Sequence, residues 1–400
     1  MRIPDVIATM RSMPRQDRSL DLAPGSVRDF RELARRRLPR QMFDYIDGGA
    51  YEETTMRANS QDLASLKLRQ RVMKDVSALS LATSVVGHEL AMPVVLAPVG
   101  LAGMFARRAE VQAALAAQAK GIAFCESTVS ICGIREVASA TSQPFWFQLY
   151  VMRDRSYAEG LMRQAHEAGC SVLVLTVDLA VVGARYRDTR NGLVGTPSLR
   201  SKLGRALDLA THPSWLVDVG IQGKPLTFGN LESAVPGARK PDQFKEWVDA
   251  QFDPSVTWED LEWVRKNWPG KIVVKGLLDV DDAKEAVARG VDGIVVSNHG
   301  GRQLDDTPST INALRTIAPA VGNDVDVMVD GGIRSGLDIV KALALGARAV
   351  LIGRAWAYAV AAAGQQGVEE VLDIIRGELE VALSLVGVPN VDALTPDVLV

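Results

Sequence analysis

The segment GIVVSNHGGRQLDD, residues 293–306, carries most of what the sequence says about the fold. Four apolar residues typical of a buried strand run directly into a histidine (His299), two glycines and an arginine (Arg302), with two aspartates close behind. A buried strand that ends in a base and a cation is typical of a site for acid–base chemistry on an anion. The alternative is a polar loop with a capping histidine, so the other strand ends become the deciding evidence.

Seven further apolar runs repeat this strand-like pattern. Together the eight runs cover residues 93–97, 122–125, 146–150, 172–177, 271–275, 292–297, 325–330 and 349–352. Helical patterns lie between most of them, at 109–120, 155–168, 280–289 and 336–346, each with a glycine at or just past its end. This alternation predicts a parallel sheet, either a (β/α)8 TIM barrel or a doubly wound sheet. Polar residues gather at the carboxyl ends of the runs, which favours the barrel because a barrel carries its site there.

The composition is that of a soluble globular protein. Of the 400 residues, 47% are hydrophobic and 23% charged, and the net charge is −3. A nucleic-acid-binding protein would usually be strongly basic, so we expect no nucleic-acid partner. Three cysteines are too few for a disulfide framework and lack metal-ligand spacing, so we expect free thiols and no metal site. No run approaches the ~18 apolar residues of a spanning helix, and no signal peptide is recognisable, so a cytoplasmic location follows by default.

Two segments depart from the barrel rhythm. Residues 1–26 are interpreted as an N-terminal arm that precedes a barrel domain at 27–400. The fourth and fifth strands lie about 95 residues apart, which predicts an insertion at about 185–255 that acts as a lid or a binding element. Within it a basic amphipathic helix is expected, with leucines on one face and cations elsewhere: Leu199, Leu203, Leu207, Arg200, Lys202 and Arg205. Such a helix can lie on an anionic membrane surface, but a lid helix packed on its own barrel explains the pattern equally well.

The loops after the last two strands predict a phosphate site. Asp330, Gly331, Gly332 and Arg334 follow the seventh strand, and Gly353 and Arg354 follow the eighth. Barrels bind phosphate at these two loops, where glycine N–H groups and a helix N-terminus face the anion. Turn glycines beside surface arginines are the alternative for either loop taken alone.

A second group of residues predicts acid–base chemistry on a carboxylate. His299 can act as a base near neutral pH, and Asp178 after the fourth strand could orient it. Arg302 and Arg185 supply forked donors that match a carboxylate, with Tyr45 and Tyr150 available for a hydroxyl or keto oxygen. Lys275 ends the fifth strand inside the ring and needs an anionic or electron-rich partner there. No dinucleotide fingerprint is present, so a cofactor with one phosphate, FMN or pyridoxal phosphate, fits better than NAD.

The chain resembles the FMN-dependent L-2-hydroxy acid dehydrogenase and oxidase family from about residue 27 to the C-terminus. The resemblance is carried by LPRQMFDYIDGGA (38–50), LAPVGLAGM (96–104), WFQLYV (146–151), LTVD (175–178), VVKG (273–276), SNHGGRQLD (297–305), DGGIRSGLD (330–338) and ALGARAVLIGRA (344–355). YIDGGAYEE, APVGLAGMFARR, GARYRD and THPSWLVDVG resemble the bacterial respiratory L-lactate dehydrogenase subgroup more than the plant oxidases.

The resemblance implies a role for each matching residue. His299 would be the catalytic base and Asp178 would support its imidazolium. The substrate would be held by four residues: Tyr45, Tyr150, Arg185 and Arg302. FMN would be held by Ala97, Pro98, Val99, Ser127, Gln148, Thr176, Lys275, Ser297, Asp330, Gly331, Gly332, Arg334, Gly353 and Arg354. Two departures stand out: Asp306 replaces a small residue, often glycine, and Val129 stands where glycolate oxidase has a tryptophan.

The implied reaction is oxidation of an L-2-hydroxy acid, L-lactate above all, to the 2-oxo acid. Electrons would pass to a quinone or a cytochrome, and the basic insertion favours a peripheral position on the inner face of the cell membrane. An oxidase of the glycolate or lactate type that uses O2, a dehydrogenase for a larger acid such as mandelate, and a flavin-binding barrel without lactate turnover are the alternatives. The resemblance also suggests a homotetramer.

Overall fold

The computed structural model describes residues 23–193, 199–232, 234, 247 and 250–400. Its centre is a closed barrel of eight parallel strands in the order β10-β3-β4-β5-β6-β7-β8-β9. The strands are β3 (Val94–Leu96), β4 (Ala123–Ser127), β5 (Trp146–Tyr150), β6 (Val172–Thr176), β7 (Lys271–Leu277), β8 (Gly293–Val296), β9 (Asp326–Val329) and β10 (Ala349–Ile352). All eight predicted runs form strands, and the (β/α)8 prediction is confirmed.

The barrel strands are buried on both faces. Small and branched side chains such as Val174, Val273 and Leu351 fill the barrel interior, which is why the sequence shows continuous apolar runs rather than alternation. The amino-terminal end is closed by a hairpin of β1 (Thr83–Val85) and β2 (His88–Leu90). Val85 belongs to the interior cluster, and Val86 donates its N–H to Asp326 at 2.6 Å. Closure of that end leaves the carboxyl ends of the strands for the site.

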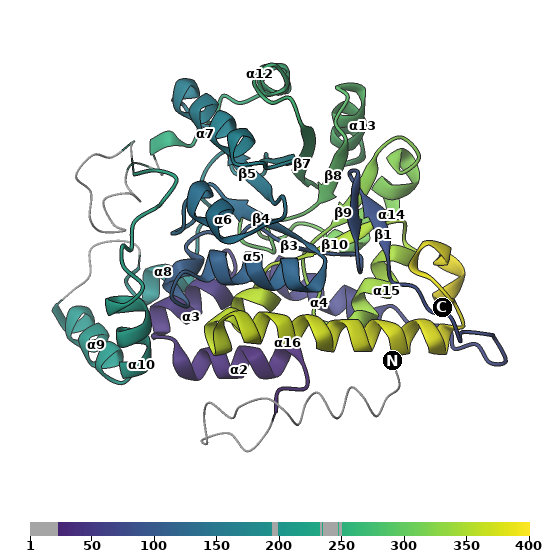
Figure 1. Ribbon diagram of the computed structural model, residues 1–400, viewed down its shortest axis with the longest axis horizontal. Helices are drawn as coiled ribbons and strands as arrows, with labels where there is room; N and C mark the ends of the chain where they lie inside the picture. Colours follow the sequence, from purple (N-terminus) through teal and green to yellow (C-terminus); the bar gives the residue numbers. More distant parts are fainter. Residues whose placement is uncertain (1–22, 194–198, 233, 235–246, 248–249) are drawn as a thin grey trace.

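Helices surround the barrel (Figure 1). They are α2 (Val27–Arg37), α3 (Arg40–Asp47), α4 (Thr54–Ser65), α5 (Ala109–Lys120), α6 (Ile134–Ala140), α7 (Arg155–Glu167), α8 (Tyr186–Arg190), α9 (Leu199–Ala210), α10 (Pro213–Trp215), α12 (Asp260–Asn267), α13 (Val280–Ala288), α14 (Thr310–Val321), α15 (Gly336–Ala344) and α16 (Arg354–Val386). Shorter helical segments are η1 (Ala102–Met104), η2 (Leu216–Ile221), η3 (Val391–Ala393) and η4 (Pro396–Val398). The four predicted helices correspond to α5, α7, α13 and α15.

Several helices had no counterpart in the sequence pattern. The N-terminal helices α2, α3 and α4 precede the barrel, and α2 packs along α16 on one side of the molecule (Figure 1). Helix α16 bends where Ala363 and Gly364 leave helical geometry, Gly364 at φ +63°. Its first residue, Arg354, directly follows the loop after β10, so the N-terminus of this long helix meets the carboxyl end of the barrel.

The insertion between β6 and β7 carries α8, α9 and α10. In Figure 1, α9 and α10 lie at the edge of the molecule, away from α12 and α13. A helix is found where the basic amphipathic helix was expected, and Leu203 and Leu207 are 63% and 62% exposed. The insertion rejoins the barrel at an antiparallel bridge between Phe252 and Met152. Within the described residues, no helix is both long and apolar enough to cross a membrane.

Candidate active site

A cavity of about 890 Å³ opens at the carboxyl ends of the barrel strands. Its wall brings together most of the residues expected from the sequence: Tyr45, Ala97, Pro98, Val99, Tyr150, Thr176, Arg185, Lys275, His299, Arg302, Asp330, Gly331, Gly332, Arg334, Gly353 and Arg354. They come from the carboxyl ends of the strands, from the loops that follow the strands and from α3, so the closed barrel is what places them around one space.

Four expected residues do not line the cavity wall: Ser127, Gln148, Asp178 and Ser297. Three of them are hydrogen-bonded to residues that do: Ser127 to Val129, Asp178 to His299, and Ser297 to His299 and Lys275. The Ser297 hydroxyl accepts from the His299 N–H at 3.0 Å and from Lys275 Nζ at 2.9 Å. Gln148 Oε1 accepts from the hydroxyl of Ser127 at 3.3 Å, while its Nε2 is buried and has no partner among the described residues.

The side chains of His299 and Asp178 form a close pair at the cavity. His299 Nδ1 lies 2.8 Å from Asp178 Oδ1, so the carboxylate fixes the ring and leaves Nε2 as the nitrogen that faces a reactant. Burial raises the pKa of Asp178, but His299 and Lys275 outweigh it and hold that pKa below its ordinary value. Gly276 follows Lys275 at φ +116°, and a Cβ there would come within 2.7 Å of the Asp178 Cβ. Glycine is therefore required for the carboxylate to reach the histidine.

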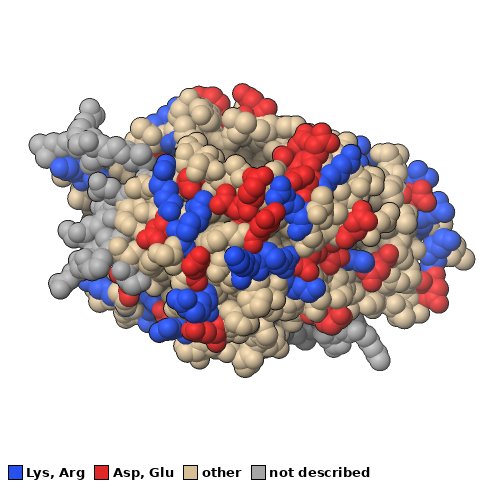
Figure 2. Space-filling view, turned by 90° about the horizontal axis from the view of Figure 1, so that it is seen from above, with Lys and Arg blue, Asp and Glu red and all other residues tan. Residues whose placement is uncertain are grey.

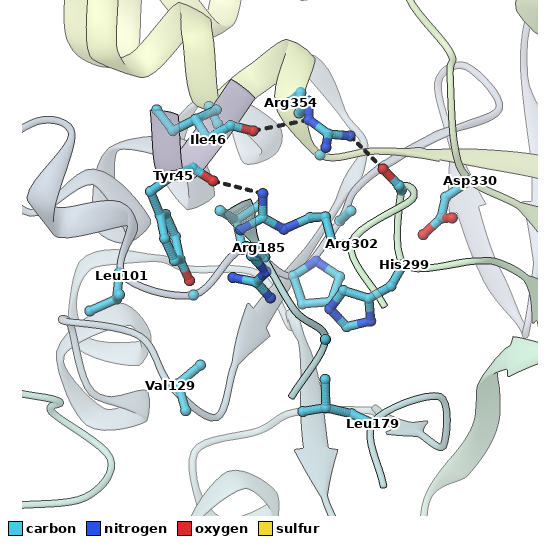
Figure 3. Close-up of a pocket in the computed structure, with 18 of the residues that line it drawn as sticks. Tyr45, Ile46, Leu101, Val129, Leu179, Arg185, His299, Arg302, Asp330 and Arg354 are labelled. Atoms are coloured by element: carbon cyan, nitrogen blue, oxygen red, sulfur yellow. Dashed lines mark hydrogen bonds between the residues drawn. The ribbon is translucent and has the colours of Figure 1, made fainter. Parts of the chain in front are cut away.

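Two arginines converge on Tyr45 beside this pair (Figure 3). The guanidinium carbons of Arg302 and Arg185 lie 4.9 and 5.7 Å from the centre of the Tyr45 ring. Burial and the neighbouring Arg185 lower the pKa of Arg302, which is the mark of two cations without enough anion between them. Arg185 Nε is buried with no partner among the described residues. The arrangement is a site for an anion, and forked guanidinium donors match a carboxylate.

Tyr150 and Lys275 complete the polar lining. Burial raises the pKa of Tyr150, so its hydroxyl stays protonated and can donate to an oxygen. Lys275 Nζ lies 3.0 Å from Asp330 Oδ2. Burial would lower the pKa of Lys275, but Asp330 and Asp178 raise it above its ordinary value, so the ammonium group stays charged within the barrel. The expectation of an anionic partner for this lysine is confirmed by Asp330.

The loops after β9 and β10 form an open cradle. Gly331 and Gly332 have φ values of +91° and +86°, and a Cβ on Gly331 would lie 2.8 Å from the Thr310 hydroxyl. Arg354 donates to the carbonyls of Ile46, Gly48 and Gly300 at 2.8–2.9 Å, so α3 holds this side chain in place (Figure 3). The N-terminus of α16 provides free N–H groups here, as phosphate sites require.

The chemistry of the lining fits a flavin mononucleotide. Thr176 Oγ1 in the cavity wall and Gln148 Nε2 behind it are buried without partners among the described residues, and such groups usually bind a polar partner. Lys275 in the cavity wall carries a positive charge, and the glycine loop after β9 fits the phosphate group of such a cofactor. Among the described residues, no cluster of side chains is suited to a metal ion.

The two departures from the family pattern have structural explanations. Asp306 is exposed and has φ +60°, a conformation that favours glycine, which accounts for the small residue usual at this position. It lies outside the cavity wall, as expected. Val129 lines the cavity, where a Cβ on Gly100 would come within 2.7 Å of its side chain, so these two residues pack tightly at one wall.

An apolar part of the wall was not predicted. It consists of Leu101, Phe105, Leu179, Val182, Phe228 and Phe252. Phe252 stands edge-on to Tyr150 with ring centres 5.6 Å apart, although it belongs to the far end of the insertion. These residues come from irregular segments with no periodic pattern, and no local signal marks them.

Comparison with known proteins agrees with this geometry. The FMN-dependent dehydrogenase family matches residues 34–400. The chain belongs to this family; it is an FMN-dependent dehydrogenase, and FMN is its cofactor. It is 54% identical over 374 residues to an L-lactate dehydrogenase of Caulobacter vibrioides, covering 94% of this chain and 97% of the relative. An L-lactate dehydrogenase of Pseudomonas syringae pv. syringae is 50% identical over 375 residues, with 94% and 98% covered.

Solved structures give the same fold. The crystal structure of the monotopic membrane protein (S)-mandelate dehydrogenase is similar with a TM-score of 0.88 and 37% identity, covering 95% of this chain and 100% of that one. A mandelate oxidase is similar with a TM-score of 0.79 and 35% identity over 93% of this chain and 97% of that one.

Proposed function

We propose that the protein oxidises L-lactate to pyruvate and passes the electrons to a quinone or a cytochrome. The observation that carries this proposal is the position of His299, fixed by Asp178 at 2.8 Å and facing the same cavity as Arg185 and Arg302. A base beside a carboxylate site is what a 2-hydroxy acid requires. Relatives named L-lactate dehydrogenase at 50–54% identity support lactate as the substrate.

Oxidation of a 2-hydroxy acid to a 2-oxo acid removes two electrons and two protons. FMN, when bound, supplies the two-electron acceptor. The guanidinium groups of Arg185 and Arg302 bind the carboxylate and orient the hydroxyl-bearing carbon. His299 accepts a proton, and Asp178 stabilises the imidazolium that results. Lys275 keeps a positive charge in the cavity wall and would stabilise negative charge that develops on the flavin when it accepts electrons.

The substrate is tested by anaerobic bleaching of the bound flavin with a panel of acids. We expect L-lactate to reduce the flavin faster than glycolate or (S)-mandelate. Faster reduction by mandelate would favour a dehydrogenase for a larger 2-hydroxy acid. The apolar wall and Val129 leave room for this alternative. Absence of bleaching by every acid of the panel would contradict the proposed activity.

For the acceptor we propose a quinone at a membrane surface. Support comes from α9, where Leu203 and Leu207 are exposed and Lys202 and Arg205 add positive charge. By contrast, the face in Figure 2 carries cations and anions interspersed. The likeness to a monotopic membrane protein points the same way. The protein would then lie on the inner face of the cell membrane.

This is tested by co-sedimentation with vesicles that contain anionic phospholipid. Charge reversal at Arg200, Lys202 and Arg205 should abolish sedimentation. A matched variant with Lys266→Glu and Lys284→Glu, on α12 and α13 at the far side of Figure 1 from α9, should keep it. Equal binding by both variants would contradict the role of α9. Rapid hydrogen peroxide release with no gain from added quinone would favour the oxidase.

The N-terminal arm and the homotetramer remain predictions. Residues 1–22 of the arm lie outside the described residues. Light scattering of the purified protein, compared with the 43.1 kDa chain mass, measures the oligomeric state.

A further inference from the structure

One arginine outside the expected site joins two carboxylates of another segment. Arg187 lies on α8, at the start of the insertion, and donates to Asp47 Oδ2 at 2.8 Å and to Glu53 Oε2 at 2.6 Å. Asp47 is the last residue of α3 and Glu53 directly precedes α4, both more than a hundred residues earlier in the chain. The side chains of Asp47 and Glu53 are 6% and 13% exposed, and that of Arg187 is 32% exposed, so the two acceptors are buried while the arginine stays in part open to water. We call these three residues the Arg187 bridge.

The acceptor at the centre of the bridge is rigidly held. Asp47 also accepts from Arg31 at 2.5 and 2.9 Å and from the hydroxyl of Tyr358 at 2.8 Å. Burial alone would raise the pKa of Asp47, but hydrogen bonds from Arg31 and Tyr358 lower it to about 2. The carboxylate is therefore ionised at every physiological pH and anchored to helices α2 and α16 as well as to α8.

The end of α3 and the turn after it also hold Arg302, one of the two arginines proposed to bind the substrate. Arg302 donates to the carbonyls of Tyr45 and Gly48 at 2.7 and 2.8 Å, on either side of Asp47 in the chain. Two backbone hydrogen bonds join the neighbouring loops: Ala50 N–H to the Gly301 carbonyl, and Tyr51 N–H to the Ala184 carbonyl, each at 2.8 Å. The turn thus fixes Tyr45, Arg302 and the residue before Arg185 at the same time.

Arg185 lies close to a second positive charge, which repels it. It shares the Tyr45 ring with a second guanidinium, that of Arg302, and the carboxylate of Asp188 lies 3.9 Å from it. Like charges in a buried site repel, so without substrate Arg185 needs a restraint to stay near its partner. Arg187, two residues further along, supplies that restraint because it pins the first turn of α8 to Asp47 and Glu53.

We propose that Arg187 is a positioning residue that holds Arg185 in register with Arg302 and Tyr45, so that the pair binds a carboxylate without first reorganising. The inference rests on the proposed function only in naming that carboxylate as the one of a 2-hydroxy acid. Arg187 is not among the residues that line the cavity, so it acts through the backbone of α8. Loss of the bridge should weaken carboxylate binding and leave the His299–Asp178 pair unchanged.

The test compares Arg187→Gln with wild type in the flavin-loaded enzyme, using pyruvate as a ligand that does not turn over. We expect the Kd for pyruvate and the KM for L-lactate to rise about tenfold, while kcat at saturating lactate and the flavin content change by less than about twofold. Arg187→Lys keeps the positive charge but cannot donate to both carboxylates as the forked guanidinium does. Its Kd for pyruvate should therefore lie between those of wild type and Arg187→Gln. Unchanged pyruvate affinity in Arg187→Gln would overturn the proposal.

Two further variants separate positioning from plain stability. Arg289→Gln removes an arginine that pairs with Glu285, Glu259 and Glu262 on the far side of the barrel, so it should lower the melting temperature without changing pyruvate affinity. In an Arg185→Gln background, Arg187→Gln should have no further effect on pyruvate binding, because its effect passes through Arg185. If Arg187→Gln weakened pyruvate binding in that background as much as it does in wild type, its effect would not pass through Arg185. If the wild-type protein binds pyruvate but no hydroxy acid reduces its flavin, the proposed function is wrong. The positioning role of Arg187 can still be tested in that case, because it is measured by pyruvate binding.

Discussion

Replacing His299 with glutamine should abolish turnover while preserving the fold and the flavin. A glutamine amide can donate to Asp178 in place of the imidazole Nδ1, which lies 2.8 Å from that carboxylate, so the local geometry survives. The group that accepts the proton is lost, because an amide is not a base. Lys275 stays protonated beside Asp330, and burial keeps the Tyr150 hydroxyl protonated, so neither can replace the base. A general base contributes roughly 10²–10⁴-fold, or about 3–5 kcal/mol of activation free energy, and kcat should fall by that amount.

The assay is stopped-flow reduction of the bound flavin under anaerobic conditions, which isolates this half-reaction from the acceptor. The variant should purify yellow, with wild-type flavin content and melting temperature, and should bind pyruvate nearly as wild type does. A reduction rate within about threefold of wild type would refute the assignment of the base, because the loss expected from base catalysis is at least about 100-fold.

Three further perturbations follow. Asp178→Asn removes the charge that stabilises protonated His299, and flavin reduction should slow by about 100-fold with little change in pyruvate Kd; an unchanged rate contradicts the pairing. Asp47 has a folded pKa of about 2 against an ordinary 3.8, so it stabilises the fold by about 2 kcal/mol above pH 4 and loses this as the pH falls toward 2. Denaturant unfolding of Asp47→Asn should therefore show a deficit at pH 6 that shrinks by about half at pH 3; a deficit independent of pH would be evidence against the ionised carboxylate. Gly331→Ala places a Cβ 2.8 Å from the Thr310 hydroxyl at φ +91°, and the Kd for FMN should rise about tenfold by fluorescence titration; unaltered affinity would exclude that loop from the phosphate site.

The barrel was predictable because its signals are local. Each strand is a short apolar run, and the polar residues at its carboxyl end lie close by in sequence: Lys275 ends its run and His299 follows two residues after its own. A closed parallel barrel then brings these ends together whatever the loops do, so the site residues could be named before their distances were known.

What escaped prediction depends on contacts between distant segments. Asp47 gains its role from Arg187 and from Tyr358, which lies 311 residues further along the chain. Phe252 reaches Tyr150 only because the insertion folds back onto β5. Neither contact leaves a periodic trace in the sequence, since each depends on one side chain reaching across the fold.

The roles of the two arginines at α8 illustrate the difference. Arg185 could be proposed as a carboxylate ligand because a forked cation near a base has an evident use. Arg187, with the same chemistry two residues later, instead donates to Asp47 and Glu53. The sequence contains both residues but not the direction of either side chain.

The most direct test of the central claim is anaerobic mixing of the purified, flavin-loaded protein with L-lactate and, separately, with D-lactate. The account predicts that L-lactate bleaches the flavin completely, with one pyruvate formed for each flavin reduced, and that D-lactate leaves the spectrum unchanged. A flavin that stays oxidised in excess L-lactate, in protein that still binds pyruvate, would contradict it.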